Sequence, residues 1–261
     1  MTLLQMILAV FSGSIVGLSL GLIGGGGSIL AVPLMIYVVG ISSPHLAIGS
    51  SAVAVGVNAF INLISHARDG NVKWRCALTF AGFGIMGAAL GAQIGKSVDG
   101  GKLLSAFGIL MIVVAGLMLI PRKGGDDAQV RLDRKSWKRL LPALSGTGFG
   151  VGALSGFFGI GGGFLIVPGL VGATSMPLLN AIGSSLVSVA AFGATAAISY
   201  AISGLVNWTV ALLFIVGGAL GGMAGVRIAN HLSTRKRTLS IVFSAVVAVV
   251  GLYVVMRGIE G

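Results

Sequence analysis

Residues 21–33 read GLIGGGGSILAVP, and residues 156–168 read GFFGIGGGFLIVP. Both stretches interrupt long apolar sequence, and Gly24 and Pro33 recur 135 positions later as Gly159 and Pro168. Glycine inside a helix costs roughly 1 kcal/mol relative to alanine, so two matched runs predict backbone that is unwound. Matched interruptions of apolar segments in the two halves of a chain indicate the binding site of a membrane transporter.

The composition predicts an all-α polytopic membrane protein. Of the 261 residues, 56% are hydrophobic and only 9% are charged, whereas a soluble domain carries about 25% charged residues. The mean hydropathy is +1.04. The apolar runs are far longer than the roughly 10 alternating residues of a membrane β-barrel strand, so the sequence favours helices.

Ten apolar segments are expected, five in each half of the chain. They span 4–22, 29–40, 44–65, 76–95, 103–120, 140–158, 164–173, 177–201, 208–226 and 238–256. The second segment of each half is shorter than the ~20 residues that cross a bilayer, so it reads as a half-helix or a re-entrant leg.

A repeat extends beyond the glycines. Residues 47–51 read AIGSS and recur at 181–185, and Val72-Lys73-Trp74 is echoed by Val206-Asn207-Trp208. The expected organisation is therefore a first transmembrane repeat at 1–120, a basic linker at 121–139 and a second transmembrane repeat at 140–261.

The positions of the basic residues predict the orientation. If each glycine-linked pair returns to its own side, fourteen of the seventeen Lys and Arg lie on one side: seven in 121–139, three in 66–75 and four in 227–237. The positive-inside bias makes that side cytoplasmic and leaves both termini outside. The net charge of +11 is then a topology signal, and no nucleic-acid partner is expected. Five segments per repeat give the second half the opposite polarity, an inverted-topology repeat.

The expected site is neutral and rich in hydrogen-bond donors. All six acidic residues lie between the segments, so no intramembrane carboxylate is present to relay protons or bind a cation. Half-helices that begin near Ile29 and Phe164 would point free N–H groups at a small anion. The candidate substrate-binding residues are Gly24, Gly25, Gly26, Gly27, Ser28, Gly49, Ser50, Ser51, Asn58, Gly159, Gly161, Gly162, Gly163, Asn180, Gly183, Ser184 and Ser185, with Asn62 as a further donor. Pro33 and Pro168 are the expected helix-break residues; no metal site and no cofactor are expected.

Several of these features also have a structural interpretation. Glycines at four-residue spacing typically allow close helix packing, which applies to Gly84, Gly87, Gly91, Gly95, Gly217, Gly221 and Gly225. Those faces would serve a homodimer as well as packing within one chain. The serines could instead bond to nearby helix carbonyls. His45, His66 and His231 lie at segment ends, where interfacial, structural roles are expected.

The paired Gly-x-Gly-Gly-Gly…Pro element, followed in each half by Ala-Ile-Gly-Ser-Ser, resembles the TauE/SafE family of sulfite-exporter-like anion permeases. The resemblance covers nearly the whole chain. It implies transport of small sulfur-containing anions, such as sulfite or organosulfonates, across the bacterial cytoplasmic membrane. By position it falls on Gly24, Gly26, Gly27, Pro33, Gly49, Ser50 and Ser51, and on Gly159, Gly161, Gly162, Gly163, Pro168, Gly183, Ser184 and Ser185.

The leading functional hypothesis is a secondary transporter of a small anion that works by alternating access between the two repeats. An anion channel with the same glycine-lined site is the alternative. A membrane enzyme is not expected, because the apolar segments carry no acid, nucleophile or metal cluster. The partners expected are the small anion and the lipid bilayer.

Overall fold

The computed structural model describes residues 2–119, 137–159, 163–231 and 236–260, and within these ranges the chain is helical with no strand. The all-α prediction is confirmed. The elements are α1 (Leu3–Ile23), η1 (Gly24–Leu30), α2 (Ala31–Pro33), η2 (Leu34–Val38), α3 (Pro44–Arg68), α4 (Trp74–Ser97), α5 (Gly100–Leu119), α6 (Trp137–Phe158), α7 (Gly163–Thr174), α8 (Leu178–Ile202), α9 (Trp208–His231) and α10 (Lys236–Glu260).

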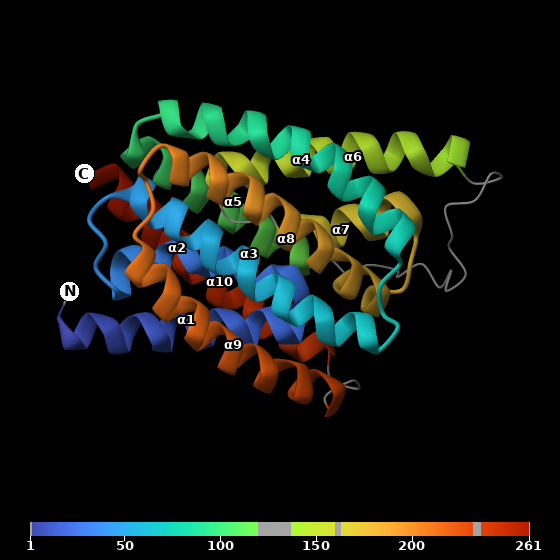
Figure 1. Cartoon of the computed structure of the whole chain (residues 1–261), viewed down its shortest axis with the longest axis horizontal. Coiled ribbons are helices and arrows are strands. Elements are labelled where there is room, and N and C mark those ends of the chain that lie inside the picture. The colour runs from blue at the N-terminus through green and yellow to red at the C-terminus, as the bar shows by residue number, and fades with distance from the viewer. Residues whose placement is uncertain (1, 120–136, 160–162, 232–235, 261) are drawn as a thin grey trace.

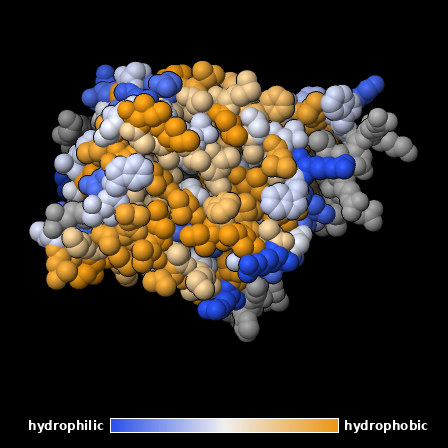
Figure 2. All heavy atoms as spheres, in the orientation of Figure 1, coloured by the Kyte–Doolittle hydropathy of each residue, from blue (hydrophilic) through white to orange (hydrophobic). Residues whose placement is uncertain are grey.

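Seven helices of the described chain are long and apolar enough to cross a membrane. They correspond to α1, α3, α4, α5, α6, α8 and α9. Residues 27–38 and 165–174 form shorter apolar stretches, as expected for the second segment of each half. Most long helices extend about a turn beyond the apolar segments, so Arg75 and Lys96 lie in the terminal turns of α4. Figure 2 shows a broad apolar surface with the most hydrophilic residues gathered toward its margins.

The first glycine run forms a helix instead of the unwound backbone predicted from its sequence. Gly24–Leu30 is a 3₁₀ helix, α2 follows directly, and Leu34–Val38 continues as a π-helix after Pro33. Ile29 therefore lies near the end of a helical element and not at its start. The i→i+3 bonding of a 3₁₀ helix keeps backbone groups paired through this glycine run.

The reversal brings the chain back along α1. A Cβ on Gly27 would lie 2.5 Å from the backbone nitrogen of Leu20, so only glycine fits there. At the far end of the returning leg, a Cβ on Gly40 would lie 3.7 Å from the side-chain nitrogen of Gln5. Residues 40 and 5 are thus neighbours, and the first hairpin is re-entrant in shape, as predicted.

The second glycine run does break the helix. α6 ends at Phe158, Gly159 adopts a positive φ of 62°, and α7 begins at Gly163. Gly161 and Gly162 lie outside the described residues. Pro168 does not end its helix, because α7 continues from Gly163 to Thr174 around it.

Glycines form the closest helix contacts, and these contacts match between the halves. A Cβ on Gly17 of α1 would overlap the carbonyl oxygen of Gly218 in α9, and a Cβ on Gly152 of α6 would overlap that of Gly84 in α4. Gly221 meets Ser14 of α1 in the same way. Close packing within one chain is therefore confirmed for these glycine faces: Gly84, Gly87, Gly91, Gly95, Gly217, Gly221 and Gly225. Figure 1 shows the α4–α6 and α1–α9 pairs on opposite sides of the molecule.

Helix directions follow from which residues meet. α3 and α8 run antiparallel, because Gly49 contacts Tyr200 while Gly56 contacts Gly193. α9 runs parallel to both α1 and α3, since residues 217, 221 and 225 follow residues 10, 14 and 18, and residues 218 and 222 meet Asn58 and Asn62. α4 and α6 run parallel to each other and to α8. The helices α1, α3 and α9 therefore run opposite to their counterparts in the other half, which are α6, α8 and α4. Both termini lie at the same end of the molecule (Figure 1).

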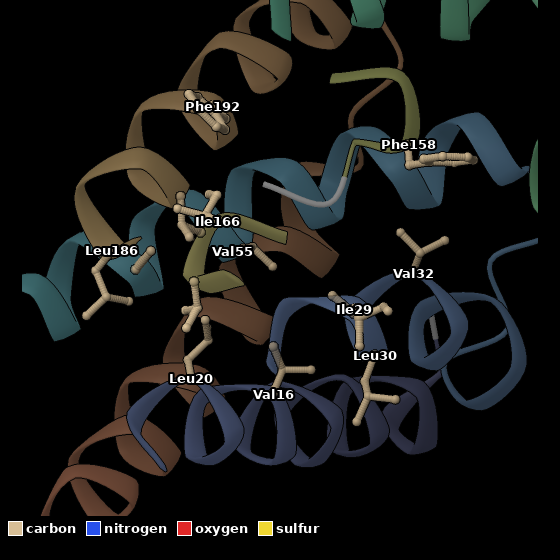
Figure 3. Close-up of a cluster of buried hydrophobic side chains, with 14 of the residues drawn as sticks. Val16, Leu20, Ile29, Leu30, Val32, Val55, Phe158, Ile166, Leu186 and Phe192 are labelled. Atoms are coloured by element: carbon tan, nitrogen blue, oxygen red, sulfur yellow. The ribbon is translucent and has the colours of Figure 1, made fainter. Parts of the chain in front are cut away.

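The core lies where the returning legs meet the long helices. Figure 3 shows Ile29 and Leu30 above Val16 and Leu20 of α1, with Ile166 of α7 nearby. All five are 0–5% exposed. This packing fixes the two short legs in the middle of the molecule, and they determine the position of the candidate site.

Candidate functional site

The turn of each glycine-broken hairpin contacts the opposite half. η1 packs against α7 and α8, and Gly159 lies on the start of α3. A Cβ on Gly159 would overlap the Ile48 side chain. The Ser51 hydroxyl donates to the Ile48 carbonyl at 2.9 Å and lies 3.5 Å from the Gly159 carbonyl oxygen. The structure thus brings together the second glycine break and the first AIGSS element.

Several candidate polar side chains are buried in the molecule, and Ser51 is the one that contacts Gly159 at this junction. Ser28 of η1, Ser51 and Asn58 of α3, and Ser185 of α8 are all fully buried. The Ser185 hydroxyl donates to the Ile182 carbonyl at 2.7 Å, as Ser51 does to Ile48. Local bonding to helix carbonyls is therefore confirmed for these two serines. Their oxygens retain acceptor capacity, but the hydroxyl hydrogens are already in use.

The neighbouring serines hold loops. The Ser50 hydroxyl accepts the backbone N–H of Asn207 at 2.8 Å, and the Ser184 hydroxyl accepts that of Lys73 at 2.9 Å. These two bonds are counterparts in the two halves. The adjacent glycines make room for the same loops, since a Cβ on Gly49 would overlap the Leu205 carbonyl oxygen.

The two AIGSS elements do not come together. Gly49 lies against Tyr200, whereas Gly183 lies against Asn71. Tyr200 follows Gly183 by 17 positions in α8, which corresponds to about 25 Å along a helix. Asn180 lies at the same end as Gly183, where its amide donates to the Asn71 carbonyl at 3.3 Å. The candidate residues therefore divide into a central group and two loop-holding groups at opposite ends of the α3–α8 pair.

One polar side chain was left out of the candidate site, although its spacing was a signal. His66, expected at a segment end in an interfacial, structural role, lies in the last turn of α3 and is 5% exposed. It follows Asn58 and Asn62 at intervals of four, so all three lie on one face of α3. That periodicity is visible in the sequence, but the helix that covers the face is not.

Among the described residues, no group of three or more His, Cys, Asp or Glu side chains is arranged to hold a metal ion. Because the hydroxyl hydrogens of Ser51 and Ser185 are in use, the neutral donors that remain are backbone amides and the Asn58 carboxamide. Such neutral donors can hold a small anion without the charge that would retain it too tightly.

Long apolar helices, two re-entrant legs and a buried neutral site define a multi-pass membrane transporter. Comparison with known families gives the finer identity: the family described as "Sulfite exporter TauE/SafE" matches residues 9–254. The chain belongs to the TauE/SafE family.

Relatives from distant organisms share this full-length match. A "Probable membrane transporter protein" of Xylella fastidiosa (strain Temecula1) is 51% identical over 257 residues, covering 98% of this chain and 97% of its own. The "Probable membrane transporter protein YunE" of Bacillus subtilis is 28% identical, covering 98% and 99%. A similarly named protein of Methanocaldococcus jannaschii is 26% identical, covering 97% of each chain. No solved structure matches the chain significantly.

Proposed function

We propose that this protein is a secondary transporter of small sulfur-containing anions, such as sulfite or organosulfonates. The observation that carries the proposal is the contact of Gly159 in the second glycine break with Ser51 of the first AIGSS element, together with the packing of η1, which contains the buried Ser28, against α7 and α8. Polar groups are buried there where two re-entrant hairpins meet long helices of the opposite half. The family description, which names a sulfite exporter, supports the substrate class.

An anion fits this junction better than a cation does. α7, which packs against η1, begins at Gly163, and the first turn of a helix has unpaired N–H groups and a positive dipole end. The polar side chains at the junction are neutral. A cation site in the middle of a membrane is expected to contain a carboxylate, and every acidic residue lies outside the ten apolar segments of the sequence.

Alternating access between residues 1–120 and 140–261 is the mechanism we infer. Two features support it: the counterpart helices run in opposite directions, and the glycine contacts of α1 with α9 are matched by those of α6 with α4. Two such repeats in opposite orientations have equivalent inward and outward arrangements, so that a site between them can open to either side. The linker 121–139 would be cytoplasmic and both termini outside the cytoplasmic membrane.

Flux into proteoliposomes tests the proposal. Purified protein is reconstituted, and the uptake of sulfite, sulfate, thiosulfate and a sulfonate is measured with and without a pH gradient. We expect saturable flux of at least one sulfur oxyanion. Curves identical to those of empty liposomes for every anion would contradict the proposal.

Two variants make the site assignment testable in the same assay. Gly26→Val adds bulk to the 3₁₀ turn and is expected to abolish flux while the chain still inserts. Gly150→Val is the matched control, because a Cβ at Gly150 meets no atom within 4 Å. Full flux through Gly26→Val would refute the placement of the site.

Counterflow of labelled substrate distinguishes a carrier from an anion channel, which would instead give conductance and no counterflow.

A further inference from the structure

One face of α3 carries three buried polar side chains in a row, Asn58, Asn62 and His66, which we call the α3 polar face. Their exposed fractions are 0%, 3% and 5%. The Asn62 amide donates to the Asn58 carbonyl at 2.9 Å. Within the described residues, neither the Asn58 carboxamide nor either ring nitrogen of His66 has a hydrogen-bond partner. Leaving a buried polar group unpaired costs about 1–3 kcal/mol, so the face needs a polar occupant.

The α3 polar face is covered by bare backbone. Gly218 and Gly222 of α9 lie directly against it: a Cβ on Gly218 would overlap the Asn58 amide, and a Cβ on Gly222 would lie 2.8 Å from the Asn62 amide nitrogen. Glycine backbone offers these amides no side-chain partner. α9 therefore closes the face in this conformation without satisfying it.

The second half of the molecule shows that packing does not require polar residues here. The counterparts of the three side chains, 134 positions later, are Phe192, Ala196 and Tyr200. Phe192 lies on Gly84 of α4 as Asn58 lies on Gly218 of α9. Phe192 and Ala196 are fully buried. Tyr200 alone keeps a polar atom, its buried hydroxyl. An equivalent helix contact is thus built from largely apolar side chains, and the polarity of α3 calls for another explanation.

We propose that the α3 polar face is a water-filled access route between the central junction and the end of the molecule that holds the 69–73 loop. The route opens when α9 separates from α3, and it rests on the transport function proposed above. The end of the route away from the junction lies near two exposed cations, Arg68 at the end of α3 and Arg227 near the end of α9, and one exposed carboxylate, Asp69, so that its net charge is positive. A positive rim attracts a hydrated anion, and carboxamides then donate hydrogen bonds to the anion or its water.

Thiol labelling tests the route without any substrate. Asn62→Cys is compared with Ala196→Cys, its counterpart, which is equally buried. Both proteins are reconstituted and treated on both membrane faces with a membrane-impermeant sulfonate-bearing methanethiosulfonate. Intact-mass spectrometry counts the adducts on each chain. Both variants carry the single native cysteine, the buried Cys76, so a wild-type sample treated in the same way gives its share of the labelling. We expect Asn62→Cys to react at least tenfold faster than Ala196→Cys.

Equal rates at the two positions, or no reaction at either, would overturn the proposed route. Should Asn62→Cys fail to elute as the wild type does, Asn58→Cys is labelled against Ala196→Cys in the same way. Labelling needs no transported anion, so a failure of the flux assay and a failure of the route give different results. Fast labelling with no flux would retain the route and reject the substrate class.

Discussion

At the scale of single residues, α4 contains glycines with opposite surroundings. A Cβ on Gly91 would overlap the carbonyl oxygen of Ala153 in α6, whereas a Cβ on Gly82 meets no atom within 4 Å. We expect Gly91→Ala to cost about 1–3 kcal/mol, because backbone cannot move aside as a side chain can. Gly82→Ala is expected to be neutral or slightly stabilising. Thermal unfolding of the detergent-solubilised protein measures both, and equal melting temperatures would refute the close α4–α6 contact.

The loop-holding serines give a second prediction for single residues. Ser50→Ala and Ser184→Ala each remove the acceptor of a partly buried loop N–H, at an expected cost of about 1–3 kcal/mol. Because the two bonds are counterparts, the two variants are expected to lose similar amounts of thermal stability. Ser105→Ala, which removes an exposed hydroxyl bonded within its own helix, is the control. A stability loss in only one of the two variants would show that the loops are held differently.

At the scale of elements, the two hairpins reverse the chain by different means. The first hairpin contains the 3₁₀ helix η1 next to its reversal, whereas the second hairpin depends on Gly159 at φ 62°. An alanine there is strained by the positive φ and overlaps Ile48. We expect Gly159→Ala to lower both melting temperature and flux, while Gly172→Ala, in open space in α7, changes neither. Wild-type stability in Gly159→Ala would contradict the described turn.

Sequence periodicity predicted the elements better than the contacts between them. Apolar run length gave the long helices and the two short legs, because a bilayer sets a minimum length for a helix that crosses it. Glycine content suggested unwound backbone in both hairpins, but Gly24–Leu30 is helical. Helix propensity gives only the free-energy cost of glycine in an isolated helix, and the packing of η1 against α1 offsets that cost here. Asn58 and Asn62 were predicted as donors, but their alignment with His66 under α9 was missed because α9 lies far away in sequence.

At the scale of the whole molecule, the separation of the AIGSS elements changes how the site was expected to be built. The candidate site predicted from the sequence included residues of both elements. The structure instead places them about 25 Å apart along α8, each beside a loop of the opposite half. Ser51, which follows the loop-holding Ser50, contacts Gly159 of the second hairpin. Ser185 lies toward the other end of α8, next to the loop-holding Ser184.

The distribution of charge gives the last prediction, the orientation in the membrane. Both termini lie at one end of the molecule (Figure 1), and basic residues are concentrated in 66–75, 121–139 and 227–237. The positive-inside bias then places the termini outside and the linker in the cytoplasm. In intact bacterial cells, an impermeant maleimide is expected to label Thr2→Cys, and to label Ser136→Cys only after permeabilisation. Labelling of Ser136→Cys in intact cells, and of Thr2→Cys only after permeabilisation, would contradict this orientation. The α3 access route would then open at the outer side of the membrane.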